Sequence, residues 1–141
     1  MNPLIEEYFD EAEVCLIASQ AVTSYTLVRR EVAAADGKLR VKAGLHDGSM
    51  LEFFLYVREH SGEIRQEKYS FHWQDAQGKL IRRWDNAPHH PLLANAPHHL
   101  HRADDSAEAV LKVPDLPCVL EHLAMTMRDN ALSAAGNSDA G

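Results

Sequence analysis

The chain has 141 residues and a formal net charge of −7, from 14 Lys and Arg against 21 Asp and Glu. That length fits one domain, and it is enough to bury a core without a disulfide or a metal ion. A hydrophobic content of 45%, with no run of about 18 apolar residues, excludes a helical membrane protein. An evenly spread acidic charge would also argue against nucleic-acid binding, because phosphate contacts need basic side chains.

The acidic excess lies at the two ends of the chain. Residues 1–13 and 103–141 each carry a net charge of −5, whereas residues 14–102 carry +3 and eight of the nine histidines. An anionic substrate is therefore expected on the central part of the chain. The N-terminus lacks the features of a signal peptide, so we expect a cytoplasmic protein. Cys15 and Cys118 stand among apolar residues and are predicted to be buried, reduced thiols.

The first predicted element is an acidic amphipathic helix from about Leu4 to Ser19, with Asn2 as the N-cap and Pro3 in the first turn. Five runs of strand character follow, and turn signals separate them. These runs span residues 24–34, 38–46, 49–59, 63–74 and 79–85. The pair Asp36-Gly37 predicts a tight hairpin turn between the first two strands, since that turn type needs positive φ angles.

The rest of the chain is predicted as a loop and a second helix. Three prolines between residues 87 and 97 exclude regular structure there. Asp115 is the expected N-cap of a helix whose apolar residues repeat at helical spacing. The sequence thus predicts an α+β fold, a five-stranded antiparallel meander sheet flanked by an N-terminal and a C-terminal helix. Residues 1–132 would form a single domain, and residues 133–141 a frayed C-terminal tail.

Nearly every chemically capable side chain lies between residues 69 and 101. Histidine can be both the base and the acid of metal-independent RNA cleavage, arginine can stabilise phosphoryl charge, and a carboxylate can orient a histidine. The candidate catalytic residues are His72, Arg83, Asp85, His89, His90, His98, His99 and His101. The candidate substrate-binding residues are Arg82 and Asn86, with Tyr69, Trp73 and Trp84 as stacking groups for a base.

Three other interpretations of these residues stay open. The histidines could bind zinc, nickel or copper, although their spacing matches no known metal motif. The same surface could bind a protein without catalysis. The imidazoles could also satisfy backbone groups of the proline-broken loop, while Trp73 and Trp84 pack in the core. We expect a function that needs no metal and no other cofactor.

Residues 83–91 read RWDNAPHHP, and residues 97–101 read PHHLH. With YSFHWQD at 69–75 and GKL at 78–80, this block resembles the signature of the TumE-like toxin family, and the resemblance extends over about residues 4–130. It implies the toxin of a type II toxin–antitoxin module that acts as a ribonuclease. The implied partners are a cognate antitoxin with a DNA-binding domain and an RNA substrate, and a homodimer is left open. The alternatives are a non-catalytic partner of such an antitoxin and a metal-dependent nuclease or hydrolase.

Overall fold

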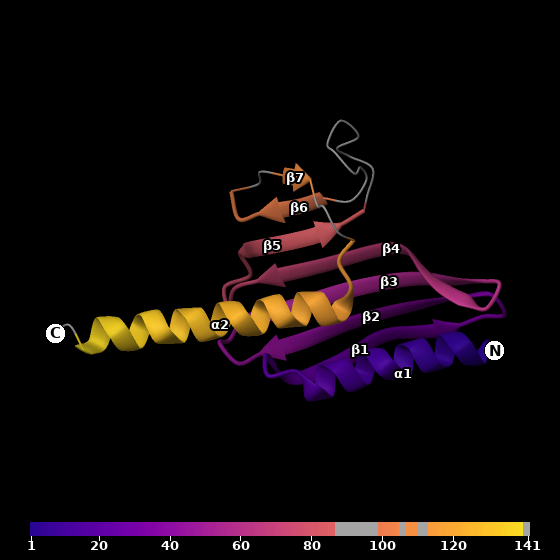
Figure 1. Cartoon of the computed structure of the whole chain (residues 1–141), viewed down its shortest axis with the longest axis horizontal. Coiled ribbons are helices and arrows are strands. Elements are labelled where there is room, and N and C mark those ends of the chain that lie inside the picture. Colours follow the sequence, from indigo (N-terminus) through magenta and orange to yellow (C-terminus); the bar gives the residue numbers. More distant parts are fainter. Residues whose placement is uncertain (87–98, 105–106, 110–112, 140–141) are drawn as a thin grey trace.

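An antiparallel sheet and two helices make up the fold in the computed structural model, which describes residues 1–86, 99–104, 107–109 and 113–139 (Figure 1). The elements are α1 (Pro3–Ala18), β1 (Val22–Val32), β2 (Asp36–Leu45), β3 (Met50–His60), β4 (Glu63–Gln74), β5 (Leu80–Asp85), β6 (His99–Arg102), β7 (Ala107–Ala109) and α2 (Leu116–Asp139). The strands follow one another across the sheet in chain order, and each is antiparallel to its neighbours. The predicted α+β meander between two terminal helices is confirmed. The sheet continues past the five expected strands with β6 and β7. The sequence did not predict these two strands because they have only four and three residues, too few for an alternating pattern to be recognised.

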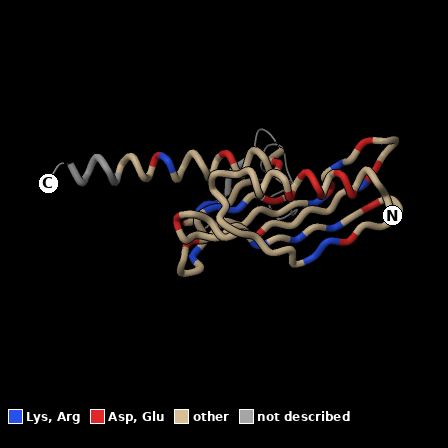
Figure 2. The backbone as a smooth tube through the Cα atoms, turned by 90° about the horizontal axis from the view of Figure 1, so that it is seen from below, with Lys and Arg blue, Asp and Glu red and all other residues tan. Residues whose placement is uncertain are grey.

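The two helices lie on the same face of the sheet (Figure 1). In the described part of the chain no helix covers the other face, which we call the open face. The open face is defined by alternate strand residues, among them Lys38, Arg40, Lys42, Glu52, Phe54, Tyr56, Lys68, Ser70, His72, Arg83, Asp85 and His101. Figure 2 shows acidic residues gathered along α1 and Lys and Arg residues distributed over the strands. The uneven charge distribution along the sequence therefore corresponds to a difference between the acidic helix α1 and the sheet, whose strands carry Lys and Arg residues.

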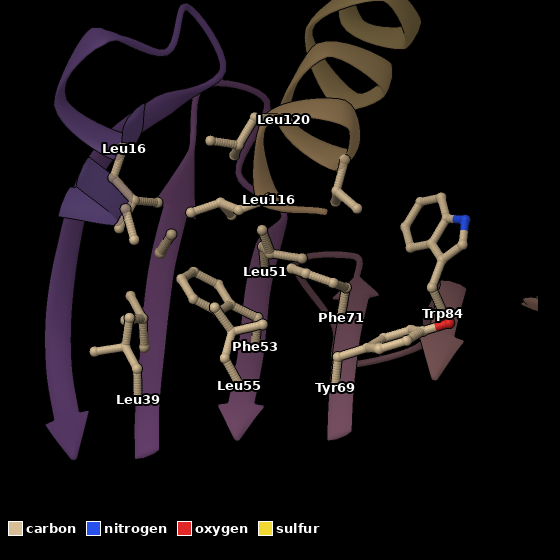
Figure 3. Packing of buried hydrophobic residues seen from close by; sticks show 14 of the residues in the cluster. Leu16, Leu39, Leu51, Phe53, Leu55, Tyr69, Phe71, Trp84, Leu116 and Leu120 are labelled. Atoms are coloured by element: carbon tan, nitrogen blue, oxygen red, sulfur yellow. The ribbon is translucent and has the colours of Figure 1, made fainter. Parts of the chain in front are cut away.

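The hydrophobic core lies between the helices and the sheet (Figure 3). Strands β2 and β3 alternate cleanly, so every second residue is buried. The residues that they bury are Leu39, Val41, Ala43, Leu45, Leu51, Phe53, Leu55 and Val57. Helix α2 covers the sheet with Leu116, Val119, Leu120 and Leu123, all at most 4% exposed. The period of two in the strands and the period near 3.6 in the helix thus bury one face of each element.

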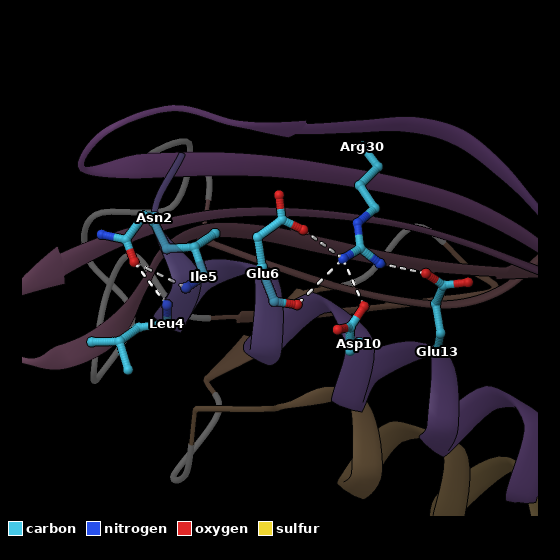
Figure 4. Close-up of polar contacts among 7 residues, drawn as sticks. All are labelled: Asn2, Leu4, Ile5, Glu6, Asp10, Glu13 and Arg30. Atoms are coloured by element: carbon cyan, nitrogen blue, oxygen red, sulfur yellow. Dashed lines mark hydrogen bonds and ion pairs between the residues drawn. The ribbon is translucent and has the colours of Figure 1, made fainter.

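Helix α1 begins at an asparagine cap, and one arginine of the sheet contacts its acidic side chains (Figure 4). The Asn2 side chain accepts hydrogen bonds from the backbone N–H groups of Leu4 and Ile5, at 3.0 and 3.2 Å, which confirms the predicted N-cap. Arg30 of β1 reaches three carboxylates of α1, those of Glu6, Asp10 and Glu13. A single cation therefore contacts three of the five acidic side chains of this helix.

The first hairpin turn differs from the prediction. Its connecting residues are 33–35, and the Ala33 N–H donates to the Asp36 carbonyl at 2.8 Å. The predicted turn at Asp36-Gly37 is wrong, because Gly37 belongs to β2 and lies under α1. A Cβ atom at Gly37 would be 2.7 Å from Ile5 Cγ2 and 2.9 Å from Phe9 Cε2, so this glycine lets the helix approach the sheet. The later turns follow the prediction, with φ near +85° at Gly48, Gly62 and Gly78.

Helix α2 begins as predicted, with the Cys118 N–H donating to the Asp115 carboxylate at 2.9 Å. It continues to Asp139 and extends past the sheet, so much of the segment predicted as a frayed tail is helical (Figure 1). Cys118 is exposed and Cys15 is half-buried, which makes the prediction of two buried thiols wrong. Neighbours along a helix point about 100° apart, so apolar flanks do not imply burial. No helix in the described residues is long and apolar enough to cross a membrane.

Candidate functional site

Three of the candidate catalytic residues lie in one row across the open face. His72 of β4 is paired with Arg83 of β5, and Arg83 is paired with His101 of β6. Strands in a sheet lie about 4.8 Å apart, so the backbones of the two histidines are roughly 10 Å from each other with the arginine between them. The meander thus brings together side chains that are up to 29 positions apart in the sequence.

Asp85 is the buried anchor of this row. Its side chain is 2% exposed, and its Oδ2 atom lies 2.9 Å from Arg83 Nε and 3.4 Å from His101 Nε2. A buried carboxylate is stable only when cations or hydrogen-bond donors surround it. The shared oxygen therefore orients both the guanidinium and the imidazole. The Arg83 side chain remains 41% exposed, so a ligand can approach it. We call His72, Arg83, Asp85 and His101 the open-face group.

Asn86 follows this group but has backbone partners. Its Oδ1 atom accepts from the Tyr69 N–H at 3.0 Å, and its Nδ2 group donates to the Glu67 carbonyl at 2.8 Å. These contacts tie the end of β5 to β4 beyond the last paired residues. In this position Asn86 supports the strand end that carries Asp85.

The remaining candidate binding residues lie on the helix side of the sheet. Tyr69, Trp73 and Trp84 are buried in the core, with exposed fractions of 2%, 4% and 9%. Burial, followed by the charge of Asp85, raises the pKa of Tyr69. The guanidinium of Arg82 lies 2.9 Å from His122 Nε2 of α2. The structure therefore does not bring these four residues together with the open-face group.

His122 is a half-buried polar residue at the edge of the core that the sequence analysis missed. Its ring meets the Trp84 ring edge-on, with centroids 5.5 Å apart, and the Trp73 ring at 6.4 Å. Burial, and then the charge of Arg82, lower the pKa of His122. A neutral imidazole can accept a hydrogen bond from Arg82, so the pair satisfies two polar groups beneath the helix. The helical spacing of the sequence could have identified it, because residue 122 adjoins the apolar stripe by which α2 packs on the sheet.

The proline-rich part of the histidine block is only partly described. His89, His90 and His98 lie outside the described residues. For His99 the description is confined to its backbone, which is paired with Asp85 in β5 and with Ala109 in β7. Within the described ranges, no group of three or more His, Cys, Asp and Glu residues is placed to hold a metal ion.

The fold and the site define a small α+β protein whose single sheet carries a histidine–aspartate–arginine group on the face opposite its two helices. A protein-family model described as Toxin TumE matches residues 12–128. This match covers most of the chain, so the chain belongs to the TumE toxin family. It is accordingly the toxin component of a toxin–antitoxin system, with a cognate antitoxin as its partner. No curated protein and no solved structure matches the chain.

Proposed function

We propose that this toxin is a metal-independent ribonuclease and that the open-face group is part of its catalytic machinery. The observation that carries the proposal is the row in which two imidazoles flank one accessible guanidinium, with a buried carboxylate beneath it. An RNA substrate, a cytoplasmic location and an antitoxin with a DNA-binding domain belong to the same proposal.

The chemistry follows from what each group can do. His101 takes the proton of a ribose 2′-hydroxyl, whose oxygen forms a bond to the adjacent phosphorus. The bond from phosphorus to the 5′-oxygen breaks, and protonated His72 donates a proton to that leaving oxygen. The products are a 2′,3′-cyclic phosphate and a 5′-hydroxyl end. In such a displacement the attacking and leaving oxygens are nearly in line, which suits a base and an acid on opposite sides of the phosphate.

Arg83 and Asp85 support this reaction electrostatically. The guanidinium can donate two parallel hydrogen bonds to the non-bridging oxygens, where negative charge develops. Asp85 keeps the His101 ring oriented and stabilises the imidazolium that forms when His101 accepts the proton. The histidines at positions 89, 90, 98 and 99 remain candidates for either proton-transfer role.

The proposal is tested by incubating the purified protein with cellular RNA in excess chelator. We expect cleavage by the parent protein, a loss of about 10²- to 10⁴-fold in His101→Ala and His72→Ala, and no change in the control His60→Ala. His60 is a suitable control because it lies at the β3–β4 hairpin end and contacts Glu67 at 2.9 Å. RNA whose riboses carry 2′-O-methyl groups should resist cleavage. Equal rates in the parent and in His101→Ala, or cleavage of the methylated RNA, would refute the mechanism.

A further inference from the structure

Two aromatic rings on the open face adjoin the open-face group. Phe54 and Tyr56 are alternate residues of β3, and both are half-buried on the side away from the helices. Phe54 is paired with Ser70 of β4, which is two residues from His72. A diagonal neighbour across two strands lies roughly 7–8 Å away, which is within reach of an aromatic side chain. The rings therefore form one surface with His72 and Arg83.

Basic side chains surround these rings. The Arg40 guanidinium carbon lies 4.8 Å from the centroid of Phe54, and Lys38 Nζ lies 6.0 Å from the centroid of Tyr56. Lys68 of β4 is paired with Tyr56 of β3, and Lys42 of β2 is paired with Glu52 of β3. A cation therefore lies over one face of each aromatic ring, and a base would stack either on the other face or in place of this cation.

The acidic groups of this part of the open face are already occupied. Glu52 lies 3.6 Å from Arg40, and Asp36 accepts a hydrogen bond from the Tyr56 hydroxyl at 2.8 Å. In the described part of the chain, the three lysines of this surface have no carboxylate within 4.0 Å. Glu31, the register partner of Lys38 in β1, is itself ion-paired with Arg29 at 2.8 Å. The lysine charges are therefore available to an anionic ligand. The acidic layer of α1 lies on the opposite side of the sheet and does not oppose such a ligand (Figure 2).

The combination selects a single-stranded nucleic acid over other anions. A base can stack on Phe54 or Tyr56 only if the face of the base is free. In a duplex the faces of the bases are covered by neighbouring bases. Aromatic rings on an antiparallel sheet bind successive bases in this way in other single-strand-binding proteins, while basic side chains follow the backbone. A free phosphate or an acidic peptide would use the lysines but would leave the rings without a role.

We infer that the open face of β2–β4 binds single-stranded RNA, with Phe54 and Tyr56 stacking bases and Lys38, Lys42 and Lys68 contacting phosphates. This surface delivers the adjoining phosphodiester to His72 and Arg83, and in that respect the inference rests on the proposed ribonuclease function. The register of the β-strands gives the path of the bound RNA. The RNA crosses β2 and β3 and reaches the row of His72, Arg83 and His101.

Binding can be measured separately from cleavage. The probe is a fluorescein-labelled single-stranded RNA of about 12 nucleotides with 2′-O-methyl riboses, a length in the range of known single-strand sites, followed by fluorescence anisotropy. We expect Phe54→Leu and Tyr56→Leu each to weaken binding by about 5- to 100-fold. The matched control Tyr25→Leu removes a tyrosine from the helix side of β1, where its hydroxyl contacts Glu13, and should bind as the parent does.

The lysines give a second measurement that does not touch the packing of the sheet. Lys42→Gln and Lys68→Gln should each lower the slope of log affinity against log salt by about 0.7. Arg128→Gln on the exposed side of α2 should leave the slope unchanged. Thermal melts of all variants report whether each is folded.

The outcomes separate the two proposals. Absence of binding, equal binding of a duplex of the same sequence, or parent-like affinity in both aromatic variants would overturn the binding surface. Loss of binding in these variants together with no cleavage of unmodified RNA by the parent would support the surface and refute the ribonuclease. Cleavage that depends on His101 but not on Phe54, Tyr56 or the lysines would support the ribonuclease and refute the binding surface.

Discussion

Replacing Gly37 by alanine tests how closely α1 packs on the sheet. The added Cβ would lie 2.7 Å from Ile5 Cγ2, 2.9 Å from Phe9 Cε2 and 3.0 Å from the Glu31 carbonyl oxygen. Carbon atoms in contact are normally about 3.5–4.0 Å apart, so the helix must move away by most of an ångström. Ile5 and Phe9 are both 0% exposed, so any shift of these side chains disturbs the core around them.

Two opposing terms set the size of the effect. Overpacking of a core costs about 1–3 kcal/mol, whereas replacing glycine in a strand recovers about 0.5–1 kcal/mol of backbone entropy. We expect the free energy of unfolding of Gly37→Ala to fall by about 1–2 kcal/mol, which lowers Tm by about 2–8 °C for a chain of this size. Urea denaturation followed by circular dichroism measures the loss directly.

A control and a second substitution identify the cause. In Gly44→Ala the nearest atoms would be the hydroxyl oxygens of Ser24 and Thr23 at 3.3 and 3.4 Å, so stability should change little. Ile5→Leu removes the branched Cγ2 methyl, so combining it with Gly37→Ala should cost less than the sum of the two single changes. If Gly37→Ala is as stable as Gly44→Ala, or if the two changes at the contact are additive, the close-approach explanation is incorrect.

Three further outcomes are expected. Arg30→Gln should lower stability by about 1–3 kcal/mol, because it leaves the three α1 carboxylates without their shared cation; parallel thermal melts of the parent and the variant measure the loss. The folded protein binds a proton at His122 more weakly than the unfolded chain does, so stability should decline as pH falls below about 6.5, and His122→Gln should flatten this decline in urea titrations between about pH 5 and 7. Asp85→Asn should lower RNA cleavage by about 10²-fold or more while binding of the methylated RNA stays near parent level; unchanged cleavage would refute the positioning role of Asp85.

Alternation along the strands made most of the fold predictable. Leu39 to Leu45 and Leu51 to Val57 repeat with a period of two, and the glycines at 48, 62 and 78 mark turns that need positive φ. The misplaced first turn has a different origin. A glycine needed for helix approach and a glycine needed for a turn look identical in a sequence, and only the contact with Ile5 and Phe9 separates them.

The candidate site was predictable in composition but not in geometry. Alternation alone separates His72 from Tyr69 and Trp73, and it equally separates Arg83 from Arg82 and Trp84. Grouping all of them by proximity in the sequence combined the two sides of the sheet. The juxtaposition of His101 with Arg83 depends on the register of β6, which a strand of four residues does not reveal. Phe54 and Tyr56 precede the histidine block by many residues, and only the pairing of β3 with β4 connects them to it.

The order of the strands across the sheet has a consequence for how the protein is made. Because each strand is paired with its neighbour in the chain, the sheet can grow in step with translation, and no strand must wait for a distant partner. The first three strands and α1 are complete once His60 has been synthesised, but the row that ends at His101 needs β6. At ordinary elongation rates of about 5–20 residues per second, these events are roughly 2–8 s apart. A nascent toxin therefore has a growing sheet for some seconds before the open-face group is complete.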